Sequence, residues 1–208
     1  LAWLCGSPYF VNINDIASDA ARDVGIVPAG FLQAALSRIE RAAYQRAAGA
    51  TVLCPSFARW LERCGFDPAR IEMIRSPIDV ESIRPVPRTG SFRRANGIPD
   101  DAFVVLFAGS MGLKQGLENV IEAAACDTTD TVWVLVGDGE ARARLERMVS
   151  DRELGARVRL AAFQPAESMA DMFADADLLL LNQLASVKDT VIPSKLLTYM
   201  AAGCPIVA

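Results

Sequence analysis

Short apolar segments alternate with helical patterns along nearly the whole chain, and this alternation constrains the fold more than any single motif does. In the second half, four apolar or β-branched runs are separated by helical patterns: 103–108, 132–136, 158–163 and 178–182. A helix between two such runs carries the chain back across the sheet, so that successive strands lie parallel. The sequence therefore predicts an α/β fold with doubly wound parallel sheets.

The first part of the chain repeats this order of elements. Apolar runs at 9–14, 51–54 and 71–75 alternate with helical patterns at 31–48 and 56–64. Apolar residues of the first helix share one face: Leu32, Ala35, Leu36, Ile39 and Ala43. The arginines of this helix lie largely outside that face, which favours a solvated surface. Contact with anionic lipid headgroups is the alternative.

Turn-forming and charged residues are concentrated between Ser76 and Pro99. Such a break in the periodic pattern is typical of a domain boundary. We expect two Rossmann-like domains, residues 1–84 and 85–208. Because the chain begins at Leu1 without a methionine and ends in an apolar run, we expect both domains to be incomplete.

The composition excludes several classes of protein. The 21 basic and 25 acidic residues give a net charge of −4, so nothing favours nucleic-acid binding through a positive field. No apolar run approaches the ~18 residues that span a bilayer, and no secretory signal opens the chain, so we expect a cytoplasmic protein. Histidine is absent, the sequence has no Cys-x-x-Cys pair, and we find no Asp-x-Asp cluster that would chelate a divalent ion beside a diphosphate. We therefore expect no metal site and no resident cofactor.

A glycine-rich segment follows the apolar run 103–108. It reads Gly109-Ser110-Met111-Gly112-Leu113-Lys114-Gln115-Gly116. Glycines at the end of a strand let the backbone approach a ligand, and a lysine there can neutralise a phosphate. The segment has neither the Gly-Lys-Ser/Thr of a P-loop nor the Gly-x-Gly-x-x-Gly spacing of a dinucleotide fold, so NAD is not favoured. Small residues that merely pack in a strand-to-helix turn are the alternative.

Further polar segments follow the other apolar runs. Gly137-Asp138-Gly139 reads first as turn chemistry. At Phe163-Gln164 the backbone could hydrogen-bond the edge of a nucleobase, or the segment could be a plain loop. All these segments fall at predicted carboxyl ends of parallel strands, where open α/β sheets bind ligands. Together they predict a ligand with phosphates and a flat base, held in a cleft between two domains.

The last segment of the chain couples a polar helix start to an apolar helix and a short strand. Ser194 is expected to cap this helix, while Gly203 ends it in a left-handed conformation and Pro205 prevents its continuation. The N-terminus of a helix carries partial positive charge and free N–H groups. Ser194 and Lys195 are thus candidates to hold a diphosphate, and a capped core helix is the alternative.

In their order and spacing these segments resemble the retaining glycosyltransferases of family 4, which have the two-domain GT-B architecture, and especially the subgroup for colanic acid and exopolysaccharide. The resemblance covers nearly all 208 positions. It rests on seven stretches: 14–19, 39–41, 78–85, 107–118, 136–139, 176–177 and 193–208.

The resemblance implies that the enzyme transfers a sugar, with retention, from a nucleoside diphosphate sugar to a saccharide or lipid-linked acceptor. This places it in cell-surface polysaccharide synthesis, peripheral to the inner membrane. The second domain would hold the donor, with Lys114 and Lys195 stabilising the leaving group. Asp15 would lie on the acceptor side. The other donor-side residues would be Gly109, Ser110, Gly112, Gly137, Asp138, Phe163, Gln164, Ser194 and Thr198.

The sequence also departs from the family. Thr190 and Thr198 stand where many relatives have glutamates that contact the donor sugar, and Ser110 stands where the family often has arginine. Ser18 replaces a proline, and a catalytic-region histidine would have to precede Leu1, so the fragment alone could be inactive. Two other functions stay open: a nucleotide-sugar epimerase of the same architecture, which would need no acceptor, and a non-catalytic nucleotide-sugar binding protein.

Overall fold

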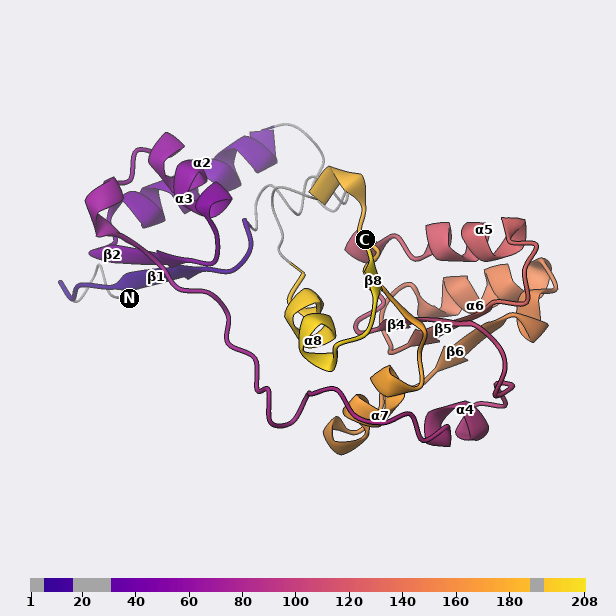
Figure 1. Ribbon diagram of the computed structural model, residues 1–208. Coiled ribbons are helices and arrows are strands. Elements are labelled where there is room, and N and C mark those ends of the chain that lie inside the picture. The colour runs from indigo at the N-terminus through magenta and orange to yellow at the C-terminus, as the bar shows by residue number, and fades with distance from the viewer. Residues whose placement is uncertain (1–5, 17–30, 188–192) are drawn as a thin grey trace. The chain divides into compact units, whose positions relative to one another are not determined.

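The computed structural model describes residues 6–16, 31–187 and 193–208. The chain divides into two compact units. Unit 1 comprises Leu1–Pro77 and Ala185–Ile192, and unit 2 comprises Ile78–Leu184 and Pro193–Ala208. The order of elements along the chain can be followed in Figure 1. All strand pairs in both units are parallel, which confirms the predicted α/β class.

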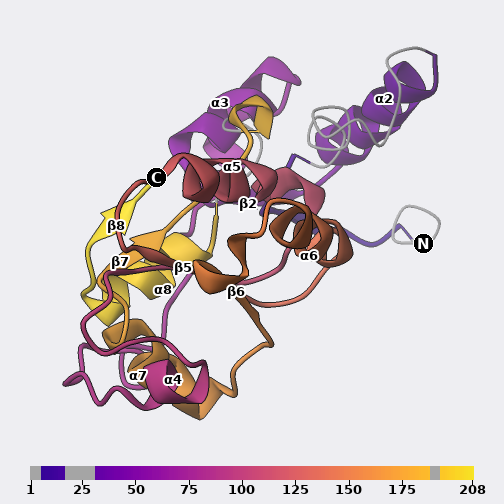
Figure 2. The ribbon, with the colours of Figure 1, turned by 90° about the vertical axis from the view of Figure 1, so that its right-hand side faces the viewer.

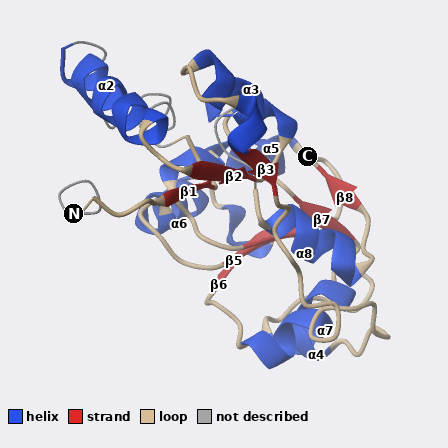
Figure 3. Ribbon diagram, turned by 90° about the vertical axis from the view of Figure 1, so that its left-hand side faces the viewer, coloured by secondary structure: helices blue, strands red, loops and turns tan. Residues whose placement is uncertain are grey.

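Unit 1 is built on a three-stranded parallel sheet of order β1-β2-β3. The strands are β1 (Phe10–Ile13), β2 (Gly49–Val52) and β3 (Ile71–Met73). Helices α2 (Phe31–Gln45) and α3 (Pro55–Arg63) lie on the same side of this sheet (Figure 3). Their contact is made by the rings of Tyr44 and Trp60, which meet edge to face with centroids 5.6 Å apart.

Helix α2 forms where its periodicity predicts, but it ends earlier. The chain leaves the helix after Gln45, and the Ala48 N–H already donates to the Tyr9 carbonyl at the start of the sheet. The apolar face expected to be buried is only partly covered: Leu36 is 43% and Ile39 is 67% exposed. Periodicity marks which residues share a face, but it does not say whether another element covers that face.

Unit 2 has a five-stranded parallel sheet of order β6-β5-β4-β7-β8. The strands are β4 (Val104–Ala108), β5 (Val132–Val136), β6 (Val158–Ala161), β7 (Leu178–Leu180) and β8 (Ile206–Val207). From β4 the chain first builds outward to β5 and β6, and then returns to the other side of β4 to form β7. The strand order therefore reverses between β4 and β7, and ligands of open α/β sheets bind at such a switch point.

Helices cover both faces of this sheet (Figure 2). Helices α5 (Glu118–Cys126) and α6 (Arg142–Asp151) pack on one face, with Phe107 and Leu135 of the strands in their core. The other face packs against α4 (Ser91–Ala95), α7 (Met169–Ala174) and α8 (Lys195–Ala202). Both faces of each central strand are buried, which explains why the strands read as continuous apolar runs.

The boundary between the units lies ahead of the position expected from sequence, between Pro77 and Ile78 rather than after Arg84. Ile83 explains the difference, because its side chain is buried in the core of unit 2. A Cβ added at Gly203 would also lie 2.8 Å from Pro85 Cγ. The turn-rich segment therefore runs along unit 2, although its composition resembles that of a linker.

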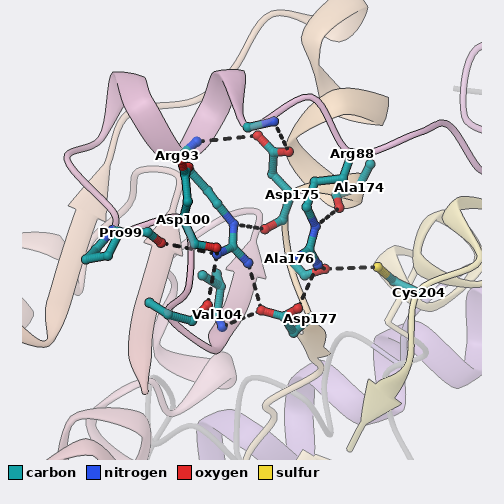
Figure 4. A network of polar contacts seen from close by, with 12 residues as sticks. Arg88, Arg93, Pro99, Asp100, Val104, Ala174, Asp175, Ala176, Asp177 and Cys204 are labelled. Carbon is teal, nitrogen blue, oxygen red and sulfur yellow. Dashed lines mark hydrogen bonds and ion pairs between the residues drawn. The ribbon is translucent and has the colours of Figure 1, made fainter. Parts of the chain in front are cut away.

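A buried arginine fastens the segment before β4 to the segment before β7 (Figure 4). The Arg93 side chain is 1% exposed, and its Nη2 donates to Asp177 Oδ2 at 2.7 Å. Nε donates to the Asp175 carbonyl, and Nη1 donates to the carbonyls of Pro99, Asp100 and Ala102. Although burial acts to raise the pKa of Asp177, hydrogen bonds from Arg88 and the Val104 N–H hold it below its usual value. These contacts connect the segments that lead into β4 and β7 at the amino edge of the sheet.

Candidate functional site

Two glycine loops lie backbone to backbone beyond the carboxyl ends of β4 and β5. The Gly109 N–H donates to the Val136 carbonyl at 2.9 Å, and the Met111 N–H donates to the Asp138 carbonyl at 2.8 Å. A Cβ added at Gly137 would lie 1.9 Å from the Gly109 oxygen. Any larger residue at Gly137 would therefore push the loops apart, which gives this glycine a packing role whatever the loops bind.

Asp138 behaves as the turn residue that the sequence predicts. Its carboxylate accepts the Gly139 N–H at 2.7 Å, and its side chain is otherwise exposed to solvent. Gly139 itself has a φ of +150°, and a Cβ there would lie 2.7 Å from the Met111 oxygen. The loop after β5 thus packs closely against the backbone of the glycine loop after β4.

Lys114 lies in a 3-10 turn, Leu113–Gln115, that the segment after β7 holds in place. Asn182 Nδ2 donates to the Gln115 carbonyl at 2.6 Å and to the Gly116 carbonyl at 2.9 Å. The Leu184 N–H donates to the Lys114 carbonyl at 3.0 Å. The switch point between β4 and β7 is therefore bridged beyond the strand ends by this turn, and Asn182 is a site residue that the sequence analysis missed.

Lys195 lies at the start of α8, and its ammonium is enclosed at the end of β4. Nζ lies 3.7 Å from the centroid of the Phe107 ring. It would also lie 2.9 Å from a Cβ added at Gly109, so the lysine reaches the glycine loop closely. Burial lowers the pKa of Lys195 to about 8, and the charge of Lys114 acts in the same direction. The structure thus brings Gly109 and Lys195, two of the candidate donor-side residues, together.

Two buried polar atoms of unit 2 lack a hydrogen-bond partner among the described residues, and both contact the glycine loop. They are Lys195 Nζ and Gln115 Oε1. Gln115 Oε1 would lie 3.0 Å from a Cβ added at Gly112. Buried polar groups are paired in most proteins, so an unpaired one needs an explanation such as a ligand. The sequence alone does not mark the Gln115 side chain as a candidate site residue.

The prediction that the Ser194 side chain caps α8 is wrong. It occupies the N-cap position, but its backbone is already helical (φ −56°, ψ −29°) and its side chain makes no capping hydrogen bond. The first turn is closed instead by the backbone, with the Leu196 N–H donating to the Pro193 carbonyl at 3.0 Å. A side chain on a helical backbone points away from the N–H groups that a cap must reach. Gly203 ends the helix in the left-handed conformation, as predicted.

The remaining predicted donor-side residues lie along the same edge of unit 2. Ser110 is exposed in the glycine loop and Thr198 is half-buried on α8. Phe163 is 58% exposed beyond β6, where Gln164 Nε2 donates to the Ala162 carbonyl. Strand β5 separates β6 from β4, so these two residues lie about 10 Å along the edge from the glycine loop.

The other predicted positions lie elsewhere. Asp15 belongs to unit 1, where its side chain is exposed. Ser18 and Thr190 lie outside the described residues. Within the described ranges, no three acidic, cysteine or histidine side chains gather as a metal site would require. No helix in those ranges combines the length and the apolar character that crossing a membrane requires.

Comparison with protein families and curated proteins identifies relatives. The family described as "Glycosyl transferases group 1" matches residues 89–208. WcaI of Escherichia coli (strain K12), which is named as a glycosyl transferase of colanic acid biosynthesis, is 34% identical over 114 residues, or 54% of this chain and 28% of that protein. D-inositol 3-phosphate glycosyltransferase 1 of Catenulispora acidiphila is 30% identical over 163 residues, or 69% of this chain and 36% of that protein.

Solved structures with the same fold confirm the GT-B architecture. Anabaena Alr3699/HepE in complex with UDP-glucose matches with a TM-score of 0.78 and 20% identity, over 100% of this chain and 54% of that one. WaaG, a glycosyltransferase involved in lipopolysaccharide biosynthesis, matches with a TM-score of 0.71 and 20% identity, over 99% of this chain and 60% of that one. The chain thus spans little more than half the length of these structures.

Proposed function

The chain belongs to the group 1 glycosyl transferases, and we propose that the protein transfers a sugar from a nucleoside diphosphate sugar to an acceptor, with unit 2 holding the donor. One observation carries this proposal: the enclosed Lys195 ammonium beside Gly109 at the switch point of the sheet. A buried cation without a hydrogen-bond or ion-pair partner is costly, and an anion is the group that compensates it best. The diphosphate of the donor supplies such an anion.

The chemistry of the step explains why cations are needed at this edge. When the bond from the sugar to the diphosphate breaks, negative charge grows on the leaving phosphate. Lys195 and Lys114 would stabilise that charge more strongly in the transition state than in the ground state. Loss of one fixed donor of this kind costs about 3 kcal/mol of transition-state stabilisation.

The proposal extends to the donor base and to the acceptor. The Anabaena neighbour was solved with UDP and with UDP-glucose, which supports a uridine nucleotide as the first donor to test. The identity to WcaI supports a saccharide or lipid-linked acceptor and a role in cell-surface polysaccharide synthesis. We infer retention of the anomeric configuration, a location in the cytoplasm, and peripheral contact with the inner membrane through a lipid-linked acceptor.

Thermal stabilisation of the full-length protein by UDP, GDP, ADP and NAD tests the donor site. A ligand at 100 times its Kd stabilises the folded state by about 2.7 kcal/mol. We expect one nucleoside diphosphate to stabilise the protein selectively. Lys195→Met should strongly reduce this effect, whereas Arg147→Met, which removes an exposed cation of α6, should retain it.

Other outcomes would refute parts of this proposal. Stabilisation by NAD alone, or by no nucleotide, would refute the donor site. If a donor binds, incubation with and without acceptor distinguishes the remaining functions. Isomerised sugar without acceptor would indicate an epimerase, and binding without transfer or hydrolysis would indicate a non-catalytic protein.

A further inference from the structure

Tyr199 joins α8 to the last residue of β4. Its side chain is 0% exposed. The hydroxyl accepts the Ala108 N–H at 2.8 Å and donates to the Ala108 carbonyl at 3.2 Å. The ring meets Phe173 of α7 edge to face, with centroids 5.6 Å apart. One phenol thus satisfies both backbone groups of the residue that precedes the glycine loop.

The hydroxyl stands where a neighbouring strand is missing. Strands β4 and β7 pair only through Val105 with Leu178 and Leu106 with Leu179. The Asp177 N–H donates to the Val104 carbonyl, so every second residue from Val104, including Ala108, directs its backbone groups toward β7. Because β7 pairs no further along β4, Ala108 meets no strand there. A hydroxyl replaces the strand because it both donates and accepts.

This contact also determines where Lys195 lies. Lys195 and Tyr199 are four residues apart on α8 and therefore share a helix face. Tyr199 holds that face against Ala108, and one turn earlier the Lys195 ammonium reaches Phe107 and Gly109 on either side of Ala108. Without the hydroxyl, the helix would lose both side-chain hydrogen bonds that join α8 to β4 among the described residues.

We propose that Tyr199 is a positioning residue that holds the Lys195 ammonium against the Gly109 loop and so prepares the donor site. The proposal rests on the proposed function, because it assigns the ammonium to the donor diphosphate. Tyr199 itself performs no proton transfer. Its hydroxyl is committed to Ala108, and burial raises its pKa to about 12 although the Ala108 hydrogen bond acts in the opposite direction.

The first experiment needs no donor and measures the enclosure of Lys195 directly. Trace acetylation with acetic anhydride is followed by mass spectrometry of the full-length protein, with Lys114 as the internal reference. Tyr199→Phe should raise the labelling of Lys195 relative to Lys114 at least fivefold, because the enclosing face of α8 is released. Val132→Ala, which removes core volume at the amino end of β5, should leave the ratio unchanged. An unchanged ratio in Tyr199→Phe would overturn the proposal.

The second experiment tests whether the effect reaches the donor. Tyr199→Phe should raise the KM for the donor about tenfold and lower kcat less. In a protein that already carries Lys195→Met, Tyr199→Phe should not change the KM for the donor any further, because the proposed effect of Tyr199 on donor binding acts through Lys195. Additive costs, or an unchanged KM, would overturn the proposal. If the unsubstituted protein binds no donor, the proposed function fails while the labelling result still decides the role of Tyr199.

A second variant covers the case in which Tyr199→Phe does not fold. Phe173→Leu keeps the hydroxyl but removes the ring edge that supports Tyr199. We expect the same increase in Lys195 labelling at a smaller size. Labelling equal to that of the unsubstituted protein would count against positioning by Tyr199.

Discussion

Donor binding is expected to take up a proton at Lys195 in mildly alkaline solution. Burial holds the pKa of the free site at about 8. A diphosphate beside the ammonium would favour the charged form and return the pKa to the ordinary lysine value, about 10.4, or above it. As the pH rises through 8, the free protein loses the proton that the complex keeps, so affinity falls tenfold per pH unit. At pH 10 the donor should bind about a hundredfold more weakly than at pH 7, which is a loss of about 2.7 kcal/mol of binding free energy.

Titration calorimetry in buffers of different ionisation enthalpy measures this uptake. At pH 8 about half of the free Lys195 is neutral, so binding should take up about half a proton per nucleotide. At pH 6.5 the uptake through this group should vanish, because the free lysine is already charged. Lys195→Met should show no such uptake at pH 8, and Arg147→Met should behave as the unsubstituted protein does.

Two results would refute this reasoning. One is a binding enthalpy that does not depend on the buffer at pH 8. The other is an affinity that stays constant up to pH 10 while the protein remains folded. Either would mean that the ammonium does not meet the anion, and the diphosphate would then have to be held by other groups of the carboxyl edge.

Three further predictions concern stability, each measured by urea unfolding of the full-length protein at pH 7. Lys195→Met should stabilise the ligand-free protein by about 1–2 kcal/mol, because it removes a mostly buried charge that has no hydrogen-bond or ion-pair partner among the described residues. Destabilisation would contradict this. Arg93→Met should destabilise it by about 3 kcal/mol, the lower end for a broken buried pair, since Asp177 keeps other partners; a loss below 1 kcal/mol would show that the network is dispensable. Gly137→Ala should cost more than 2 kcal/mol, because its Cβ would collide with Gly109; a neutral effect would show that the loops separate easily.

The fold could be predicted because its signals are local and repeated. Every strand of unit 2 lies within a predicted apolar run, and β5 (Val132–Val136) matches its run from end to end. Helix α8 ends at Gly203 as expected, since a left-handed residue at a helix end is a requirement of the backbone itself. These features depend on neighbours in sequence, and the sequence contains those neighbours.

The contacts that shape the site could not be predicted in this way, because they join residues far apart in the chain. Tyr199 reads as one more apolar position of a helix, and only its contact with Ala108 shows the role of the hydroxyl. Asn182 reads as the end of a strand, yet it holds the turn of Lys114. Gly137 reads as a ligand-binding glycine, whereas its nearest neighbour is the backbone of Gly109.

The pattern of satisfied and unsatisfied groups explains how the switch point becomes a binding site. Where β4 and β7 separate, their backbone groups lose the partners that a sheet provides, and each loss must be compensated. Tyr199 does this for Ala108 of β4, and Asn182 supplies a donor to the Gln115 and Gly116 carbonyls of the turn beyond it. Among the described residues of this edge, they leave the buried polar atoms of Lys195 and Gln115 without a hydrogen-bond partner. A ligand bearing both an anion and hydroxyl groups would satisfy both, so the stability forgone in the free protein would be recovered only when such a ligand binds.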